Sequence, residues 1–124
     1  MQEQQKKNRK LTLLIIRCTS SNTIIHANWQ KNKNIVVSAG YAGFLGSNRS
    51  TTHAAQKTGE CIGKKLTKIK QKDIVAVFRD SSDKEHRNKR AVIKGLKKFK
   101  INIRKVIVDA KIAHNGCRLK KKKR

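Results

Sequence analysis

The chain has 124 residues, with 32 lysines and arginines against 7 aspartates and glutamates, and its formal net charge is +25. This length fits a single domain with a modest core, and the charge favours a polyanionic partner, nucleic acid first and an anionic membrane surface second. One Trp, one Tyr and three Phe are too few for a membrane-bound amphipathic helix. No apolar run approaches the about 20 residues of a membrane span, so we expect no membrane partner.

Three cysteines, Cys18, Cys61 and Cys117, stand at wide spacings without a C-x-x-C pair. His114 and Cys117 lie three residues apart, but no second pair completes a tetrahedral zinc site. We therefore expect reduced thiols, no metal site and no cofactor. The opening residues, MQEQQKKNRK, lack the apolar stretch of a secretory signal and do not resemble an import presequence.

The first part of the chain predicts a basic arm followed by three strands. Residues 1–10 are polar and predict a flexible arm, whose cations include Lys6, Lys7 and Arg9. Short runs of Ile, Leu and Val, separated by polar turn residues, then predict an antiparallel meander of strands over 11–17, 23–29 and 35–39.

The rest of the chain predicts two helices and two more strands. Apolar residues at steps of three and four predict one helix from Thr51 or Thr52 to about Ile69 and another over about 87–99. The remaining segments are buried-type strands at 73–79 and 101–108, a polar loop over 80–88, and a flexible basic tail over 111–124. The order β-β-β-α-β-α-β predicts an α/β domain over 11–110, with a mixed five-stranded sheet and two helices packed on its faces.

Acidic residues are too scarce for most catalytic sites. Asp80 and Asp83 share one polar loop and could bind a metal ion together, but such residues more often cap the following helix. A two-metal nuclease needs several converging acidic groups, and the chain has no nucleophile elbow. We therefore expect no catalytic residues and no enzyme activity.

The basic residues gather in clusters. Residues 84–100 hold eight against one acidic residue, and residues 111–124 hold seven with no acidic residue. A charge run is commonly a solvated surface, but clusters of this density exceed what solubility requires. Because lysines outnumber arginines 23 to 9, we expect contacts with the phosphate backbone rather than with base edges. The scarcity of aromatic residues disfavours a stacking platform for single strands.

A glycine-spaced segment precedes the first predicted helix. Residues 40–56 read GYAGFLGSNRSTTHAAQ, with Gly40, Gly43 and Gly46 three apart. Glycines permit positive φ and close backbone approach, and the N–H groups at a helix start bind anions. Arg49 and the neighbouring hydroxyls would add charge and hydrogen bonds. The segment is not a Walker loop, because the G-K-S/T ending is missing, and its spacing also suits a plain tight turn.

Three motifs together resemble one known family. AGYAGFLGSNRSTTHAAQ, at 39–56, resembles the A-G-x-x-G-F-x-G-S/T-x-K/R-x-S/T-P-x-A-A-Q signature of the eleventh small-subunit ribosomal protein family, in its bacterial-type form. HNGCR at 114–118, followed by KKKKR, is similar to this family's H-N-G-C-R-P-P-K-K-R-R ending. SSNTII at 20–25 is similar to its N-N-T-I hairpin turn. Motif order and spacing agree over residues 11–124.

The resemblance implies a structural protein of the small ribosomal subunit, with a ribonuclease H-like sheet and no nuclease chemistry. Family members sit on the platform near the mRNA exit side and the E site, bind central-domain rRNA and adjoin other platform proteins. We leave mRNA contact open and expect no homo-oligomer. Basic extensions of this kind order on binding RNA. Carried over to this chain, the RNA-binding residues are Lys6, Lys7, Arg9, Asn22, Thr23, Gly43, Gly46, Ser47, Arg49, Ser50, Thr51, Lys84, Arg87, His114, Asn115, Gly116, Arg118, Lys120, Lys121, Lys122, Lys123 and Arg124.

The chain also departs from the family pattern. In place of a Lys-Gly-Pro-Gly-rich loop it has RDSSDKEHR at 79–87, where Lys84 and Arg87 would substitute by charge. The absence of proline and the abundance of Lys, Ile and Asn are typical of an AT-rich gene. These departures indicate a mitochondrially encoded member, bound to ribosomes in the matrix. Two alternatives stay open: a free-standing basic nucleic-acid chaperone and a metal-dependent nuclease.

Overall fold

The computed structural model describes residues 11–81, 86–110 and 114–124. The predicted element order is confirmed: the strands and helices are β1 (Thr12–Cys18), β2 (Thr23–Gln30), β3 (Lys33–Ser38), α1 (Thr52–Lys68), β4 (Asp73–Ser81), α2 (His86–Lys98) and β5 (Asn102–Ala110), with a short 3₁₀ turn, η1 (Gly46–Ser50), before α1. The predicted arm with Lys6, Lys7 and Arg9, and the predicted contacts of Asp83 and Lys84, lie outside the described residues. The division into arm, domain and tail stays a prediction.

The five strands form one mixed sheet, as predicted, in the order β3-β2-β1-β4-β5. β1 pairs with β2, and β2 with β3, in antiparallel fashion, whereas β1 with β4 and β4 with β5 are parallel. The hairpin between β2 and β3 is tighter than predicted, because the predicted strands over 23–29 and 35–39 left a longer connection between them. Gln30 pairs with Lys33, and the two residues between them include Asn32 at a φ of 66°, a conformation that asparagine tolerates well.

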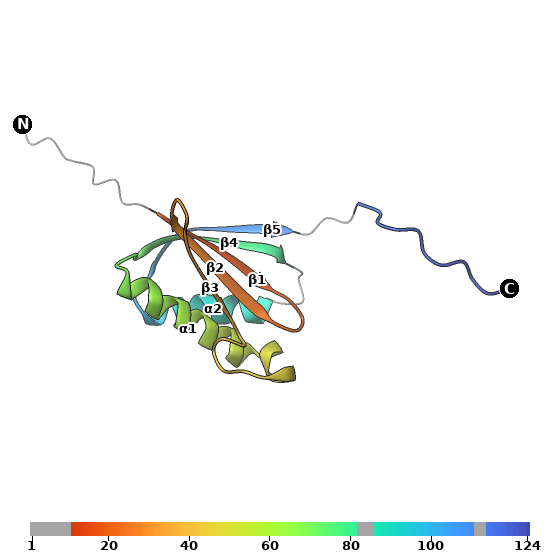
Figure 1. Ribbon diagram of the computed structural model, residues 1–124, viewed down its shortest axis with the longest axis horizontal. Coiled ribbons are helices and arrows are strands. Elements are labelled where there is room, and N and C mark those ends of the chain that lie inside the picture. Colours follow the sequence, from red (N-terminus) through yellow and green to blue (C-terminus); the bar gives the residue numbers. More distant parts are fainter. Residues whose placement is uncertain (1–10, 82–85, 111–113) are drawn as a thin grey trace, which may run out of the picture.

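Both helices cover the same face of the sheet (Figure 1), where the prediction placed helices on its faces without restricting them to one. The strand order explains this. The connections from β3 to β4 and from β4 to β5 join parallel strands and progress in the same direction across the sheet. Because such crossovers are right-handed, both connecting helices must lie on one side.

The core fills the space between this face and the helices. The predicted helix stripe is confirmed, since Ala55, Ile62 and Leu66 of α1 are fully buried. They belong to one cluster with Leu14 of β1 and Phe78 of β4, which are buried at alternate strand positions. No helix in the described ranges is long and apolar enough to cross a membrane.

The two helices run parallel and nearly touch. A Cβ built on Gly59 would lie 2.6 Å from the carbonyl oxygen of Val92, and one built on Gly95 would overlap the carbonyl oxygen of Gln56. Gly59 and Gly95 therefore both serve the close packing of the two helices. Parallel packing also brings the two helix N-termini side by side, beside the end of the glycine loop.

Candidate nucleic-acid interface

The glycine loop, residues 40–50, is closed by its own backbone. The N–H of Gly43 donates to the carbonyl of Gly40, and that of Phe44 donates to the carbonyl of Ala39, both at 3.1 Å. Gly43 and Gly46 have φ values of 98° and 52°, and a Cβ added at either residue would meet nothing within 4 Å. Glycine is therefore required there for backbone conformation rather than for space. The predicted positive φ is confirmed, and the backbone at these two points is open to a ligand.

Arg49 holds the loop together from inside. Its Nε donates to the carbonyl oxygen of Phe44 at 3.1 Å, and its guanidinium lies against Gly40, where a Cβ would be 3.3 Å from Cζ. Gly40 is thus the glycine that permits a close approach. Sequence reasoning predicted Arg49 only as a phosphate contact. Any such contact would be made by the Nη groups while Nε keeps the loop closed.

The hydroxyl groups of residues 47–51 lie at the end of the loop, just before α1. Thr51 is the N-cap, because its Oγ1 accepts a hydrogen bond from the N–H of Ala54 at 3.2 Å. It is one of the two residues predicted to start this helix. The hydroxyls of Ser50 and Thr51 donate to the carbonyls of Ser47 and Asn48, at 2.7 and 2.8 Å. Phosphate only accepts hydrogen bonds, so these two hydroxyls would have to rotate to bind it. Ser47 is exposed, and its hydroxyl is the better placed donor.

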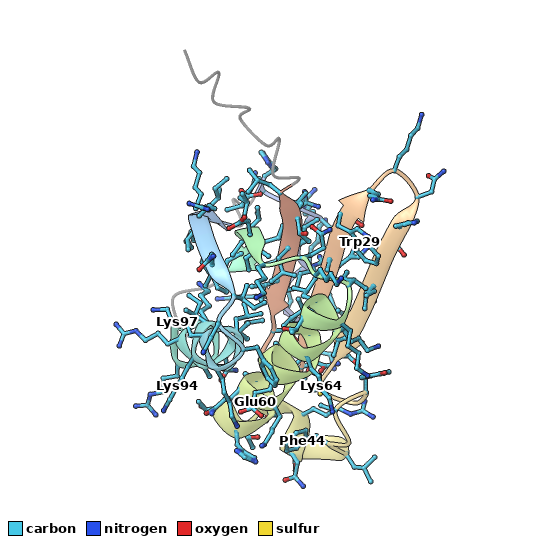
Figure 2. The ribbon with its side chains drawn as sticks, turned by 90° about the vertical axis from the view of Figure 1, so that its left-hand side faces the viewer. Trp29, Phe44, Glu60, Lys64, Lys94 and Lys97 are labelled. Carbon is cyan, nitrogen blue, oxygen red and sulfur yellow. The ribbon has the colours of Figure 1, made fainter. Side chains whose placement is uncertain are left out.

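Aromatic contacts fix the loop to α1. The Phe44 ring meets the His53 ring edge-on, with centroids 5.7 Å apart. The Lys65 Nζ lies 4.2 Å from the centre of the Tyr41 ring, within cation–π range. Figure 2 shows Phe44 in the loop at the same end of the molecule as the start of α1. Two side-chain contacts thus hold the loop against α1.

A basic surface lies on α2, beside the first turns of α1. Arg90, Lys94 and Lys97, which we call the α2 stripe, repeat at steps of four and three and are exposed. Figure 2 shows Lys94 and Lys97 projecting away from the helix pair. A depression of about 310 Å³ between the two helices is lined by Thr52, Gln56, Arg87, Arg90, Ala91 and Lys94. The stripe therefore borders the first turns of α1, the helix that the glycine loop precedes.

The predicted RNA-binding residues include Arg87 but not the α2 stripe. Sequence reasoning counts the stripe's cations only as part of a cluster. Their spacing of four and three residues is the signal that would have placed them on one helix face. Arg87 is exposed near the start of α2.

The acidic side chain of Glu60, between the two helices, is already paired. The Glu60 side chain is only 13% exposed and lies 3.3 Å from both Lys57 and Lys98. Burial alone would raise the pKa of Glu60, but hydrogen bonds and charge from Lys57 and Lys98 outweigh it and lower that pKa. Glu60 thus stays ionised and joins α1 to α2. It neutralises neither the loop nor the stripe.

The predicted hairpin-turn residues differ in accessibility. Asn22 is half-buried, and its Oδ1 accepts from the N–H of Thr23 at 2.8 Å. The Thr23 side chain is fully buried, and its hydroxyl has no hydrogen-bond partner. An RNA contact by the Thr23 side chain would therefore need a rearrangement of this turn, whereas Asn22 lies nearer the surface.

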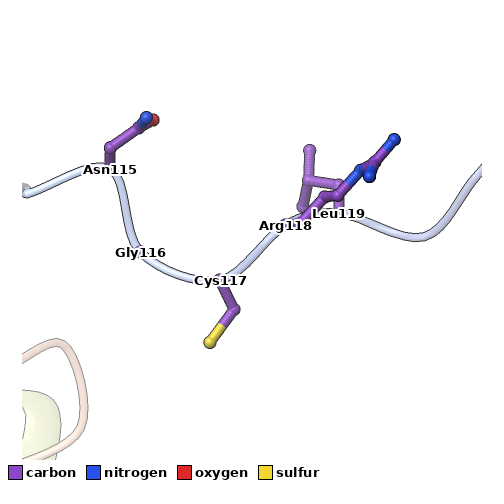
Figure 3. A pocket seen from close by; sticks show the side chains of 5 residues that line it. All are labelled: Asn115, Gly116, Cys117, Arg118 and Leu119. Carbon is purple, nitrogen blue, oxygen red and sulfur yellow. The ribbon is translucent and has the colours of Figure 1, made fainter.

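The described tail, residues 114–124, forms no helix or strand and is exposed throughout. Asn115 and Gly116 have φ values of 66° and 38°, so the chain bends sharply there. Residues 115–119 line an open hollow, in which Figure 3 shows Asn115 and Arg118 on the side of the chain away from Cys117. The predicted tail residues, His114, Asn115, Gly116, Arg118, Lys120, Lys121, Lys122, Lys123 and Arg124, are thus all accessible.

The cysteines take no part in a metal centre within the described ranges. Cys18 is buried, Cys61 half-buried and Cys117 exposed, and none of the three forms a disulfide. Among residues 11–81, 86–110 and 114–124, no group of three His, Cys, Asp or Glu side chains could hold a metal ion.

The role of Arg49 in the loop leads to a direct prediction. Arg49→Lys keeps the charge but loses the Nε donor, so we expect the amides of residues 42–46 to exchange with solvent roughly tenfold faster, since a hydrogen bond from a charged group contributes about 1.5 to 3 kcal/mol. Hydrogen exchange read by mass spectrometry would measure this. Arg104→Lys, which disturbs only the exposed pair with Asp73, is the control. Equal loop exchange in both variants would mean that Arg49 does not close the loop.

Comparison with known proteins agrees with these features. The model of the family described as ribosomal protein S11 matches residues 13–124. Small ribosomal subunit protein uS11m of Prototheca wickerhamii is 31% identical over 117 residues, which cover 94% of this chain and 88% of the relative. Small ribosomal subunit protein uS11 of Rhodopirellula baltica is 32% identical over 111 residues, covering 88% and 84%. The matched region includes both the glycine loop and the tail.

Proposed function

The chain belongs to the ribosomal protein S11 family, and from this premise we propose that it binds central-domain rRNA on the platform of a mitochondrial small ribosomal subunit. Membership itself gives the chain a structural, non-enzymatic role in the small subunit, with rRNA and other ribosomal proteins as its partners. The finer parts of the proposal are the rRNA domain, the place near the mRNA exit and E site, and the organelle. Its main support is that the family match, over residues 13–124, spans the glycine loop, the α2 stripe and the basic tail.

The geometry supports contacts with phosphates more than with bases. The glycine loop offers open backbone at Gly43 and Gly46, and Ser47 adds an accessible hydroxyl. The start of α1 follows the loop directly, and the α2 stripe lies on the neighbouring helix. Such a surface combines N–H groups, helix ends and lysines, which suit the RNA backbone. The tail adds six cations over residues 118–124.

The proposed location rests on a relative and on composition. One relative is a mitochondrial uS11m, while others are bacterial, such as uS11 of Ehrlichia chaffeensis. The proline-free composition rich in Lys, Ile and Asn is typical of an organellar gene. We therefore assign the chain to ribosomes of the mitochondrial matrix.

Sedimentation of a native organelle lysate on a sucrose gradient tests the proposal. We expect the protein to migrate with the small subunit, to stay bound through a wash at moderate salt, and to remain with the small subunit when Mg²⁺ depletion separates the two subunits. A structural rRNA-binding protein makes many phosphate contacts and leaves only at high salt.

The rival functions give different profiles. A free-standing chaperone would sediment near the top or spread with DNA. A nuclease would cleave RNA in the presence of Mg²⁺ and lose that cleavage in Asp80→Asn. Either profile, with no peak at the small subunit, would contradict the proposal.

A further inference from the structure

The face of the sheet opposite the helices carries a continuous apolar row. Ile15 of β1 pairs with His26 of β2 and with Val77 of β4, His26 pairs with Val36 of β3, and Val77 pairs with Ile107 of β5. One row thus crosses all five strands, with four aliphatic side chains and one imidazole. We call the surface around this row the open face.

Neighbouring rows widen this surface. Leu13 and Val75 pair with each other on one side of the row, and Ile24 lies on the other side, in register with Arg17. Val36, Leu13, Ile107 and Ile24 are 54%, 40%, 39% and 36% exposed. A solvent-facing sheet surface normally carries polar residues at these positions, and parallel strands are nearly always covered on both faces. Two of the four strand pairings in the open face are parallel. We therefore expect another molecule to cover this face.

Cations stand at the margin of the open face and not along its row. A hollow of about 270 Å³ is lined by Ile15, Arg17, Ile24, His26, Val36 and Arg79. Lys105, which pairs with Val75, lies on the other side of the row. The surface thus has an apolar floor with Arg79 on one side and Lys105 on the other, and it is complementary to an apolar segment flanked by carboxylates.

We propose that the open face binds a neighbouring protein through an apolar segment flanked by aspartate or glutamate. The inference rests on the proposed function, because the partner would belong to the same subunit. RNA fits this face poorly, since the row has no aromatic platform for bases and no lysine or arginine for phosphates. A second copy is disfavoured by its own charge of +25.

A photoreactive residue on the open face tests the proposal. The full-length chain carrying benzoylphenylalanine at Val36 would be assembled into small subunits in lysate, and the subunits purified and irradiated. We expect a cross-link to a protein, at a peptide with an apolar residue at the link and acidic residues within a few positions. The same probe at Ser47 in the glycine loop serves as the control and should cross-link to rRNA.

Each result decides between the alternatives. A cross-link from Val36 to rRNA, or to a second copy of this chain, would overturn the proposal. The proposal would also be overturned if the Val36 probe gave no cross-link while the Ser47 probe reacted, because no protein would then cover the open face in the subunit. Failure of both probed chains to sediment with the small subunit would instead count against the proposed function.

Matched substitutions provide a second readout. In Ile24→Gln/Val36→Gln, which leaves the charge unchanged, the protein cross-link from a probe at Leu13 should fall at least tenfold. In Val106→Gln/Val108→Gln it should persist, because these exposed residues pair in register with Ala76 and Phe78 on the helix-covered face. Equal yields in the two variants would contradict docking on the open face.

Discussion

Gly95→Ala should lower the free energy of unfolding by about 2 kcal/mol, although alanine is the better helix former. The added Cβ would overlap the carbonyl oxygen of Gln56, and no side-chain rotation can relieve a clash with backbone. The helices would have to separate along their whole contact. Overpacking of this kind costs up to about 3 kcal/mol, and the higher helix propensity of alanine returns about 1 kcal/mol.

Gly63→Ala is the matched control for this effect. A Cβ at Gly63 would lie 3.1 Å from Cδ2 of the Phe99 ring, which can turn aside, so the propensity gain offsets most of the cost. We expect its free energy of unfolding to stay within about 0.5 kcal/mol of the parent, as for most substitutions that leave the core intact. Urea titrations followed by circular dichroism, in buffer with sulfate to screen the charge, would measure both. A Gly95→Ala protein as stable as the parent would show that the two helices have room for a methyl group at this position.

Removing residues 117–124 should have the largest effect on RNA binding. The truncation removes six cations, each of which contributes about 0.7 to 0.9 to the slope of log K against log salt when it contacts a phosphate. If all six make contacts, the slope flattens by about 4 to 5, and the affinity at low salt falls by several orders of magnitude. Binding of the full and truncated chains to a small-subunit rRNA fragment over a salt series would measure the slope.

The control for the tail must keep its charge. Cys117→Ser/Leu119→Ser changes the two uncharged residues of the removed segment and should leave the slope unchanged. The fold should also survive truncation, because the described tail adds no helix or strand to the sheet. A truncated chain with the parent's slope would show that the tail does not contact phosphates.

Local signals account for most of the fold that was predicted. Ala55, Ile62 and Leu66 recur at helical spacing, and Thr51 supplies a cap, so α1 could be placed within a residue or two. β4 extends to Ser81, beyond the predicted end at 79, because the polar residues after Phe78 still pair with β5. Polar composition marks turns only on average, and tertiary pairing overrides it at this strand end.

Features that depend on long-range contacts were not predictable. The inward hydrogen bond of Arg49 to Phe44 and the clash at Gly95 exist only once the loop has folded and the helices have met. The row from Val36 to Ile107 likewise depends on strand order and register. One local signal did point to it: in LTLLIIR, apolar residues fill both faces of the strand, as they do in strands covered on both sides. Contact between RNA and the residues carried over from the family stays a prediction.

The parallel packing of α1 and α2 has an electrostatic consequence. Each helix behaves as a macrodipole with about half a positive charge at its N-terminus, and here the two positive ends stand side by side. The first turn of neither helix contains an acidic residue. The repulsion between these like poles is highest when no anion is present, and a phosphate group at the shared end relieves it for both helices at once. If the RNA backbone binds there, it would also stabilise the helix pair, and folding and assembly would be thermodynamically coupled.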